Sequence, residues 1–377
     1  MKHRFLYPER VLAGLALAGL LTAMTAGVAA QGLFTTRTLS NPGGPASIAI
    51  ADFNLDEKAD LATGNFDMAT GRTVGVRLGN GDGTFPAPTL YNLSAPPSSV
   101  VAADLNGDFF PDLALTMDNA NAVAVLLGLG DGTFSAPENY GTAGGPHYLT
   151  AVDINNDFCL DLAVAAQPSG MVSLLTNRCD GTGTFRPASH MAVGPFPHSI
   201  ASGDLDFDFN ADFIVVNITL HQLNIYMGNG DGTFRRGASL DVGTFPHHVL
   251  VADINGDFWP DLVSADSFES NTASVLWNLG DSSFFLIAQY PVGDGPLHAE
   301  TGDFNGDLIA DLALTNRGTN NVSILLGDGF GTFGEATYYP AGAETTRLAV
   351  GDLNGDNKPD VATADVEGNS ITLLLSR

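Results

Sequence analysis

The chain has 377 residues, of which 42 are Asp or Glu and 15 are Lys or Arg, so its formal net charge is −27. Because 44% of the residues are hydrophobic, the chain can bury a core, which excludes a disordered acidic polypeptide. The negative charge also disfavours binding to nucleic acid or to anionic lipid headgroups, since both would repel it.

The first 30 residues have the pattern of a signal peptide. Lys2, Arg4 and Arg10 form a basic start, residues 11–30 are uncharged and mostly apolar, and the small residues at 28–30 suit a signal peptidase. We therefore expect a protein secreted to the extracellular space, the cell surface or the periplasm, with a mature chain of residues 31–377 and no stable membrane insertion. The alternative is a retained membrane anchor, because about 20 apolar residues can span a bilayer.

An acidic segment recurs through the mature chain at a spacing near 50 residues. Its copies begin at Asp52, Asp104, Asp153, Asp204, Asp253, Asp303 and Asp352, with spacings of 52, 49, 51, 49, 50 and 49 residues. Repeats of this length are typical of propeller blades or of solenoid coils.

The sequence of each repeat predicts four short strands. In the second repeat, an apolar strand at 99–103 precedes the acidic segment and another at 112–116 follows it. A polar turn, an alternating third strand, a Gly-rich turn such as 79–85 and a weaker fourth strand come next in the repeats. Seven repeats of this kind predict an all-β fold, a seven-bladed β-propeller of four-stranded antiparallel blades over residues 31–377.

The two ends of the repeat array are offset by one strand. Residues 371–375 match the third strand of a repeat, whereas residues 33–39 resemble the fourth strand of other repeats, such as 84–91. We expect the N-terminal strand to complete the last blade, because this removes a free sheet edge. A solenoid has no use for such an offset.

The acidic segments have the oxygen spacing of Ca²⁺ loops. Ca²⁺ takes about six to eight oxygen ligands, and positions 1, 3, 5 and 9 of every segment are Asp or Asn, with the carbonyl of position 7 as a further donor. The predicted ligands are Asp52, Asn54, Asp56 and Asp60; Asp104, Asn106, Asp108 and Asp112; Asp153, Asn155, Asp157 and Asp161; Asp204, Asp206, Asp208 and Asp212; Asp253, Asn255, Asp257 and Asp261; Asp303, Asn305, Asp307 and Asp311; and Asp352, Asn354, Asp356 and Asp360.

We predict up to seven structural Ca²⁺ ions at these segments. The segments hold more than half of the acidic residues of the mature chain, and without cations these carboxylates would repel one another and raise one another's pKa. For any single segment, the alternative is an acidic turn that binds no metal.

These residues also carry a family resemblance. Phe/Leu-Asn-Gly-Asp-x-x-x-Asp-Leu-Ala, followed by Val-x-x-Leu-Leu-Gly-x-Gly-Asp-Gly-Thr-Phe, resembles the FG-GAP/VCBS repeat of integrin α-chain propellers and of many secreted bacterial proteins. The resemblance covers about residues 33–377. It implies a propeller with Ca²⁺ between the first and second strands of each blade and a role in cell adhesion or ligand binding. The family also includes lectins and non-catalytic modules attached to enzymes, so it does not identify the ligand.

Histidines gather five or six residues before the acidic segments. The paired positions there hold Ala46/Ser47, Ser98/Ser99, His147/Tyr148, His198/Ser199, His247/His248, Leu297/His298 and Thr346/Arg347. Because the first strand of a propeller blade is innermost, we expect these side chains to ring one mouth of the central channel, on the face opposite the acidic segments. The candidate ligand-binding residues are His147, Tyr148, His198, His247, His248, His298 and Arg347, with Glu300 nearby.

Three interpretations of this histidine cluster stay open. It could bind an anion, a sugar or a peptide, or its imidazoles could hold a transition metal. It could also be a turn copied with the repeat, in which each imidazole bonds a backbone carbonyl.

Cys159 and Cys179 are the two cysteines of the chain. Cys159 is at position 7 of the third acidic segment, and Cys179 follows the third strand of the same repeat, so both turns project from one face of the blade. A disulfide is therefore geometrically plausible and suits an exported protein. Two free thiols are the alternative.

No motif of a known catalytic site is present. The sequence contains no Gly-x-Ser-x-Gly elbow, His-Glu-x-x-His, phosphate loop or dinucleotide fingerprint, so we expect a non-enzyme. We predict a secreted, monomeric adhesion or ligand-binding module whose partner is an extracellular protein or carbohydrate. The alternatives are a secreted carbohydrate-active hydrolase or lyase that uses the His-lined mouth with Glu300, and a passive structural protein.

Overall fold

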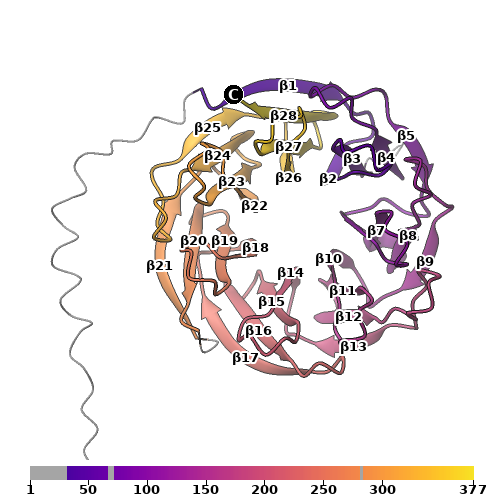
Figure 1. Cartoon of the computed structure of the whole chain (residues 1–377). Coiled ribbons are helices and arrows are strands. Elements are labelled where there is room, and N and C mark those ends of the chain that lie inside the picture. The colour runs from indigo at the N-terminus through magenta and orange to yellow at the C-terminus, as the bar shows by residue number, and fades with distance from the viewer. Residues whose placement is uncertain (1–31, 67–71, 281–282) are drawn as a thin grey trace, which may run out of the picture.

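The structure is a computed structural model that describes residues 32–66, 72–280 and 283–377. Within these residues the chain forms 28 strands in seven four-stranded antiparallel sheets, arranged as blades around a central axis (Figure 1). One short 3₁₀ helix, Asp118–Ala120, interrupts this part of the chain. The predicted seven-bladed propeller is confirmed, and the predicted signal peptide lies outside the described residues.

In each blade the strands follow one another from the axis to the rim. Blade 1 contains β2 (Pro45–Ala51), β3 (Asp60–Asn65), β4 (Thr73–Arg77) and β5 (Thr89–Asn92). Blade 2 contains β6 (Ser99–Ala103), β7 (Asp112–Met117), β8 (Ala122–Leu126) and β9 (Glu138–Gly141). Blade 3 contains β10 (Pro146–Val152), β11 (Asp161–Ala166), β12 (Met171–Leu175) and β13 (Ser189–Ala192). Blade 4 contains β14 (Pro197–Gly203), β15 (Asp212–Asn217), β16 (Gln222–Gly228) and β17 (Phe234–Asp241).

The remaining blades continue the same order. Blade 5 contains β18 (Pro246–Ala252), β19 (Asp261–Asp266), β20 (Thr272–Asn278) and β21 (Phe284–Pro291). Blade 6 contains β22 (Pro296–Gly302), β23 (Asp311–Asn316), β24 (Asn321–Leu325) and β25 (Thr337–Pro340). Blade 7 contains β26 (Thr345–Gly351), β27 (Asp360–Asp365), β28 (Ser370–Ser376) and the N-terminal strand β1 (Phe34–Ser40).

The N-terminal strand closes the ring. β1 pairs antiparallel with β28, in a register that runs from Phe34 opposite Ser376 to Ser40 opposite Ser370. The inner strands β2 and β26 pack against each other, so blade 1 follows blade 7 without a gap. Figure 1 shows β1 on the rim beside β28, which joins the two ends of the array. The predicted closure is confirmed.

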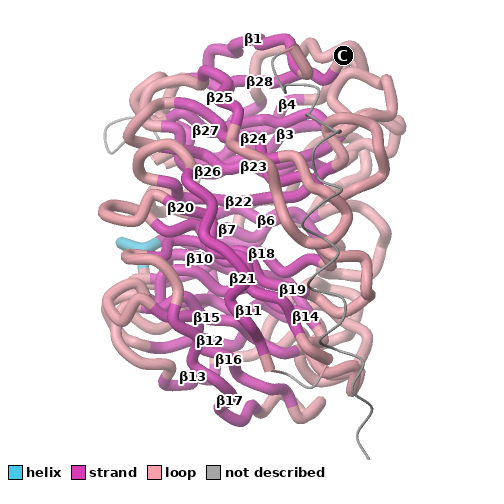
Figure 2. Tube along the Cα trace, turned by 90° about the vertical axis from the view of Figure 1, so that its left-hand side faces the viewer, coloured by secondary structure: helices cyan, strands magenta, loops and turns pink. Residues whose placement is uncertain are grey.

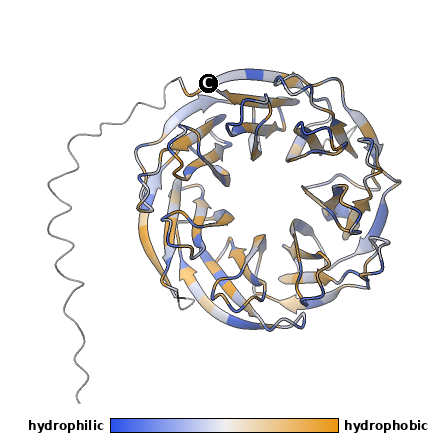
Figure 3. Cartoon of the chain, viewed as in Figure 1, coloured by the Kyte–Doolittle hydropathy of each residue, from blue (hydrophilic) through white to orange (hydrophobic). Residues whose placement is uncertain are grey.

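Apolar clusters between neighbouring blades hold the ring together. In the described chain there are seven of them, one at each interface between blades; that of blades 1 and 2 includes Val74, Val76, Leu113 and Leu115. Because a blade packs against a neighbour on both of its sides, the second strands are buried along their whole length, as in β7. Figure 3 shows hydrophobic residues along the strands of the blades.

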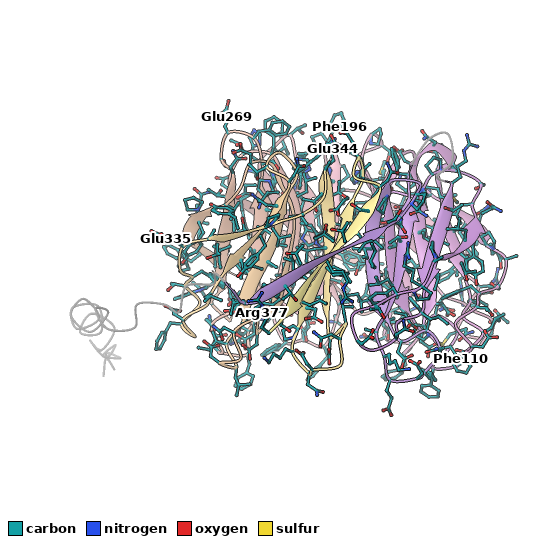
Figure 4. The ribbon with its side chains drawn as sticks, turned by 90° about the horizontal axis from the view of Figure 1, so that it is seen from above. Phe110, Phe196, Glu269, Glu335, Glu344 and Arg377 are labelled. Atoms are coloured by element: carbon teal, nitrogen blue, oxygen red, sulfur yellow. A yellow bond between two sulfur atoms is a disulfide. The ribbon has the colours of Figure 1, made fainter. Side chains whose placement is uncertain are left out.

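The connections between strands leave the ring on two opposite faces (Figure 2). We call the face with the acidic segments the acidic face and the opposite one the mouth face. Figure 4 shows Phe110, from the second acidic segment, on one face and Phe196, Glu269 and Glu344 on the other. Among the residues described, no helix is long and apolar enough to cross a membrane.

Candidate binding cavity and acidic loops

Each acidic segment folds around its first carboxylate. In the second segment, Asp104 Oδ1 accepts hydrogen bonds from the backbone N–H of Gly107 at 2.7 Å and of Asp108 at 3.2 Å, and its Oδ2 accepts one from Phe109 at 2.8 Å. Gly107 and Phe109 are left-handed, with φ of 78° and 71°. The chain therefore wraps tightly enough to point positions 1, 3 and 5 toward one another.

The carboxylate at position 9 braces the loop against the blade. Asp112 Oδ2 accepts the N–H of Leu105 at 2.8 Å, and its Oδ1 accepts the N–H of Gly128 at 2.7 Å. Burial raises the pKa of Asp112 to about 6, and the nearby Asp108 and Asp104 raise it further but to a smaller extent. Burial thus exceeds carboxylate repulsion as the cause of the raised pKa.

The fourth segment differs from the others at position 3. In the second segment the Asn106 Nδ2 donates to Asp108 Oδ2 at 2.8 Å, which ties positions 3 and 5 together. The fourth segment has Asp206 there, and one carboxylate oxygen from each of Asp204, Asp206 and Asp208 lies within 4.8 Å of the others. Asp206 Oδ1 is buried and has no hydrogen-bond partner. An orphaned oxygen among converging carboxylates is the chemistry that a hard divalent cation satisfies, so these residues fit Ca²⁺.

A disulfide joins the third acidic segment to the neighbouring turn of its blade. Cys159 and Cys179 are bonded, with their Cα atoms 5.7 Å apart. The bond closes a loop that contains β11 and β12. Because both sulfur atoms are used in it, they are not available as metal ligands.

On the mouth face, β-bulges interrupt the strand pairing at the first residue of these pairs in six of the seven blades. The pairing of β10 with β11 skips from Pro146 to Tyr148, so His147 has no partner across the ladder. The same shift leaves Ala46, His198, His247, Leu297 and Thr346 unpaired in five other blades. A bulge re-aims a side chain away from its place in the sheet.

These side chains line a cavity of about 320 Å³ on the propeller axis, which we call the axial cavity. Its lining includes the first residue of the pair from every blade, namely Ala46, Ser98, His147, His198, His247, Leu297 and Thr346. Tyr148, Arg347, Arg317 and Glu344 also contribute to it. The structure therefore brings five of the seven predicted ligand-binding residues to one cavity.

Three of the histidines form a hydrogen-bonded chain. His147 Nδ1 lies 3.2 Å from the carbonyl of His198, and His198 Nδ1 lies 2.8 Å from the carbonyl of His247. Since carbonyls only accept, both Nδ1 atoms carry hydrogen, and His198 Nε2 is then the acceptor for His247 Nδ1 at 3.2 Å. His247 Nε2 keeps a bare lone pair, which is buried without a partner.

All three imidazoles are neutral at pH 7. Burial lowers the pKa of His147 and of His247 to about 4, and it lowers the pKa of His198 well below its usual range. The expectation that each imidazole bonds a carbonyl describes His147 and His198, whereas His247 bonds an imidazole instead.

Tyr148 forms the floor of the axial cavity. Its hydroxyl lies 2.9 Å from Nε2 of both His248 and His298, and the guanidinium carbon of Arg347 lies 4.1 Å above its ring. Burial lowers the pKa of His248 to about 3, so that this imidazole also stays neutral. His248 and His298 are thus beneath the floor and brace Tyr148, and neither lines the axial cavity.

The sequence suggested that Glu300 lies at the mouth, and this prediction is wrong. Glu300 is two residues after His298 on β22, which places it about 7 Å deeper along the strand. It lines two smaller cavities of about 210 and 260 Å³ below Tyr148 and is absent from the axial cavity. Burial raises the pKa of Glu300 to about 7. The tyrosine floor therefore separates this carboxyl from His147, His198 and His247.

A second cavity on the mouth face was not predicted from the sequence. This rim groove, about 650 Å³, shares His247, Leu297, Arg317 and Glu344 with the axial cavity, so the two are continuous. Its other residues come from separate turns of blades 5 to 7 and include Phe268, Asn271, Asp294, Asn320 and Glu367. The Asn residues belong to the polar turns between the second and third strands of the repeats, and Asn271 Oδ1 accepts the N–H of Gly295 at 2.9 Å.

The repeats match one family model in five places. FG-GAP-like repeats are found at residues 104–164, 153–215, 208–264, 253–314 and 303–363. The chain belongs to the FG-GAP-like repeat family. No curated protein matches this FG-GAP-like chain in sequence.

Solved structures share the propeller fold at low sequence identity. BBS1N, crystallised in complex with ARL6DN, has a TM-score of 0.65 at 12% identity, over 91% of this chain and 96% of that one. Virginiamycin B lyase from Staphylococcus aureus has a TM-score of 0.62 at 15% identity, over 91% and 100% of the two chains. A lectin from Agrocybe aegerita that recognises non-reducing terminal N-acetylglucosamine has a TM-score of 0.57 at 20% identity, over 91% and 86%. At these identities the likeness concerns the fold, which serves both enzymes and binding proteins.

Proposed function

We propose that this FG-GAP-like propeller is a secreted, monomeric ligand-binding module. Its mouth face binds an extracellular carbohydrate or protein. The observation that carries the proposal is the continuous surface formed by the axial cavity and the rim groove, to which every blade contributes. Cavities with a few convergent polar groups are the usual location of a binding site.

The lining favours a carbohydrate over an apolar ligand. Phe268 is 64% exposed at the groove and offers a ring face, while Asn271, Asp294 and Glu367 offer hydrogen-bonding groups around it. A sugar has hydroxyl groups around apolar C–H faces, and such a mixture of partners matches it. The similar lectin from Agrocybe aegerita binds a sugar on the same fold, which is consistent with this choice.

We infer that Ca²⁺ supports the module from the opposite face. The fourth segment supplies Asp204, Asp206 and Asp208, and the orphaned Asp206 Oδ1 supports a cation there. The other six segments offer the same positions with Asn in place of the central Asp. After equilibrium dialysis against buffer with about 1 mM Ca²⁺, elemental analysis should find several Ca²⁺ per chain in excess of the buffer, and an excess near zero would contradict this role.

A glycan array tests the binding function. We expect the wild-type protein to bind a defined set of glycans and the His147→Ala and His247→Ala variants to lose that binding. His190→Ala is the matched control, because His190 lies on the outer strand β13 and bonds Ser173 Oγ at 3.0 Å, far from the cavities. Equal binding by all four proteins, or binding to no glycan and to no extracellular protein, would contradict the proposal.

An enzyme remains the second candidate. Glu300, with its pKa raised to about 7, is the observation that favours it, since such a carboxyl can exchange a proton near neutral pH. The similar virginiamycin B lyase is catalytically inactive when one of its histidines is replaced by alanine, so the fold can carry His-dependent chemistry. Product analysis on the glycans that bind distinguishes an enzyme from a binding module. Release of shortened sugars would identify a hydrolase, and release of unsaturated sugars would identify a lyase.

A further inference from the structure

Among the described residues Arg347 is a cation that forms no ion pair, although Glu300 lines one of the smaller cavities together with it. Its Nη1 donates to Ser99 Oγ at 3.0 Å, and its guanidinium stacks on Tyr148. Among the described residues the ion pairs are those of Lys58, Arg235 and Arg317, and Arg347 forms none. A partly buried guanidinium has five N–H donors to satisfy, and leaving its charge unpaired is costly. A site with this arrangement is completed by an anion.

The charged side chains that line the axial cavity sum to one positive charge, although the protein is strongly acidic. Its charged lining residues are Arg347, Arg317 and Glu344, and Glu344 Oε1 already pairs with Arg317 Nη2 at 2.7 Å. The lining histidines are neutral and so is Tyr148, whose pKa burial raises to about 12. One positive charge is therefore left over, in a chain whose formal net charge is −27.

His247, which lines the same cavity, also carries an unused hydrogen-bond acceptor. His247 Nδ1 donates to His198 Nε2 at 3.2 Å, so the buried Nε2 of His247 can only accept a hydrogen bond, and nothing donates to it. His247 lines both the axial cavity and the rim groove. A ligand that satisfies both groups needs an anionic end for Arg347 and a hydroxyl donor for His247.

We propose that the axial cavity is a subsite for a carboxylate-bearing sugar residue, such as a uronic acid. Its carboxylate pairs with the planar guanidinium of Arg347, a geometry that arginine recognises through two parallel hydrogen bonds. One of its hydroxyl groups donates to His247 Nε2, and the rest of a longer glycan extends into the rim groove. This subsite specifies the ligand of the binding function proposed above and rests on it.

Two sugars that differ only at C6 test the subsite. D-glucuronate and D-glucose share the same ring, and C6 is a carboxylate in the first and a hydroxymethyl group in the second. In ligand-observed NMR titrations at constant ionic strength, we expect the wild-type protein to bind glucuronate at least about 10-fold more tightly than glucose, since hydrogen bonds to charged groups are the stronger ones. Equal affinities, or no binding of glucuronate, would overturn the proposal.

Variants then assign the preference to residues. Arg347→Gln should abolish the preference for glucuronate, whereas Arg236→Gln, which removes an exposed arginine of the outer strand β17, should keep it. His247→Phe removes the acceptor but keeps a ring, and it should lower the affinity for both sugars by a similar factor. A preference that survives Arg347→Gln contradicts the subsite.

A stability measurement separates a ligand role for Arg347 from a structural one. Because Arg347 has no ion pair to lose and only its hydrogen bond to Ser99 and its stack on Tyr148 are removed, the Arg347→Gln variant should melt only slightly below the wild-type temperature. A strongly lowered melting temperature would show that the residue holds the fold and would count against the subsite. Binding of neutral glycans without any preference for uronates would leave the broader binding function standing and would overturn the subsite alone.

Discussion

Truncation of Phe34 tests whether the N-terminal strand holds the ring closed. Phe34 begins β1 and is only 4% exposed. Its ring meets those of Phe304 and Tyr339 edge-on, with centroids 5.6 and 5.1 Å apart, and it packs in the apolar cluster between blades 6 and 7. The side chain therefore fastens β1 to the blade beside the one that β1 completes.

Phe34→Ala should lower the free energy of unfolding by about 3–5 kcal/mol, the usual cost of removing a buried aromatic ring together with the cavity that it leaves. The two edge-on ring pairs account for about 0.5–1.5 kcal/mol each of this loss. The control is Phe285→Ala on β21, the corresponding outer strand of blade 5, where the ring is 61% exposed and the expected loss is under about 0.5 kcal/mol.

The assay is urea unfolding at a fixed Ca²⁺ concentration, followed by far-ultraviolet circular dichroism. The difference between the two variants is the quantity that matters, because both remove the same side chain from an outer strand. If Phe34→Ala cost no more than Phe285→Ala, the closure by β1 would contribute little, and the reasoning from burial would be wrong.

Three further predictions concern the metal, the disulfide and pH. Chelation of Ca²⁺ should lower the melting temperature, and readdition should restore it. A site with a dissociation constant near 10⁻⁴ M adds about 1.4 kcal/mol to the free energy of unfolding at about 1 mM Ca²⁺. An unchanged melting temperature argues against metal sites. Replacing Cys159 and Cys179 together by Ser should cost about 3 kcal/mol in urea unfolding, since the bond spans a sequence separation of 20 residues, and a loss below about 1 kcal/mol would be inconsistent with this loop-closure effect. The pKa of His248 is about 3 in the folded state and about 6.5 in the unfolded state, so only the unfolded state binds a proton as the pH falls below 6.5. Lowering the pH from 7 to 5 should therefore reduce the free energy of unfolding by about 2 kcal/mol through this residue. His248→Gln should reduce that pH dependence, and an identical slope in the variant and the wild type would refute the assignment.

Much of the fold could be predicted because the repeat is local. Each acidic segment lies between two strands that pair with each other, so its recurrence from Asp52 to Asp352 gave the number of blades directly. The offset between residues 33–39 and 371–375 predicted the closure, since a strand without a neighbour must find one. The positions of the loop carboxylates followed from the same repeat.

The mouth could be predicted only in part. The histidine pairs were located on the innermost strands, but pair spacing could not show which member faces the cavity. The structure decides this: the first member of each pair lines the axial cavity, at a bulge in six of the seven blades, while Tyr148 forms its floor and His248 and His298 lie beneath. Glu300 was misplaced for the same kind of reason, since two residues along a strand move a side chain to another level of the channel.

The repeat period, the carboxylate spacing and the strand pattern are thus properties of the sequence alone, because hydrogen bonds and turns between neighbouring strands fix them. Tertiary structure decided that Arg347 forms no ion pair with any described residue, that His247 Nε2 has no donor among these residues, and that turns of blades 5 to 7 form one groove. These facts depend on residues as far apart as Tyr148 and Arg347, which only closure of the ring brings together around a shared axis.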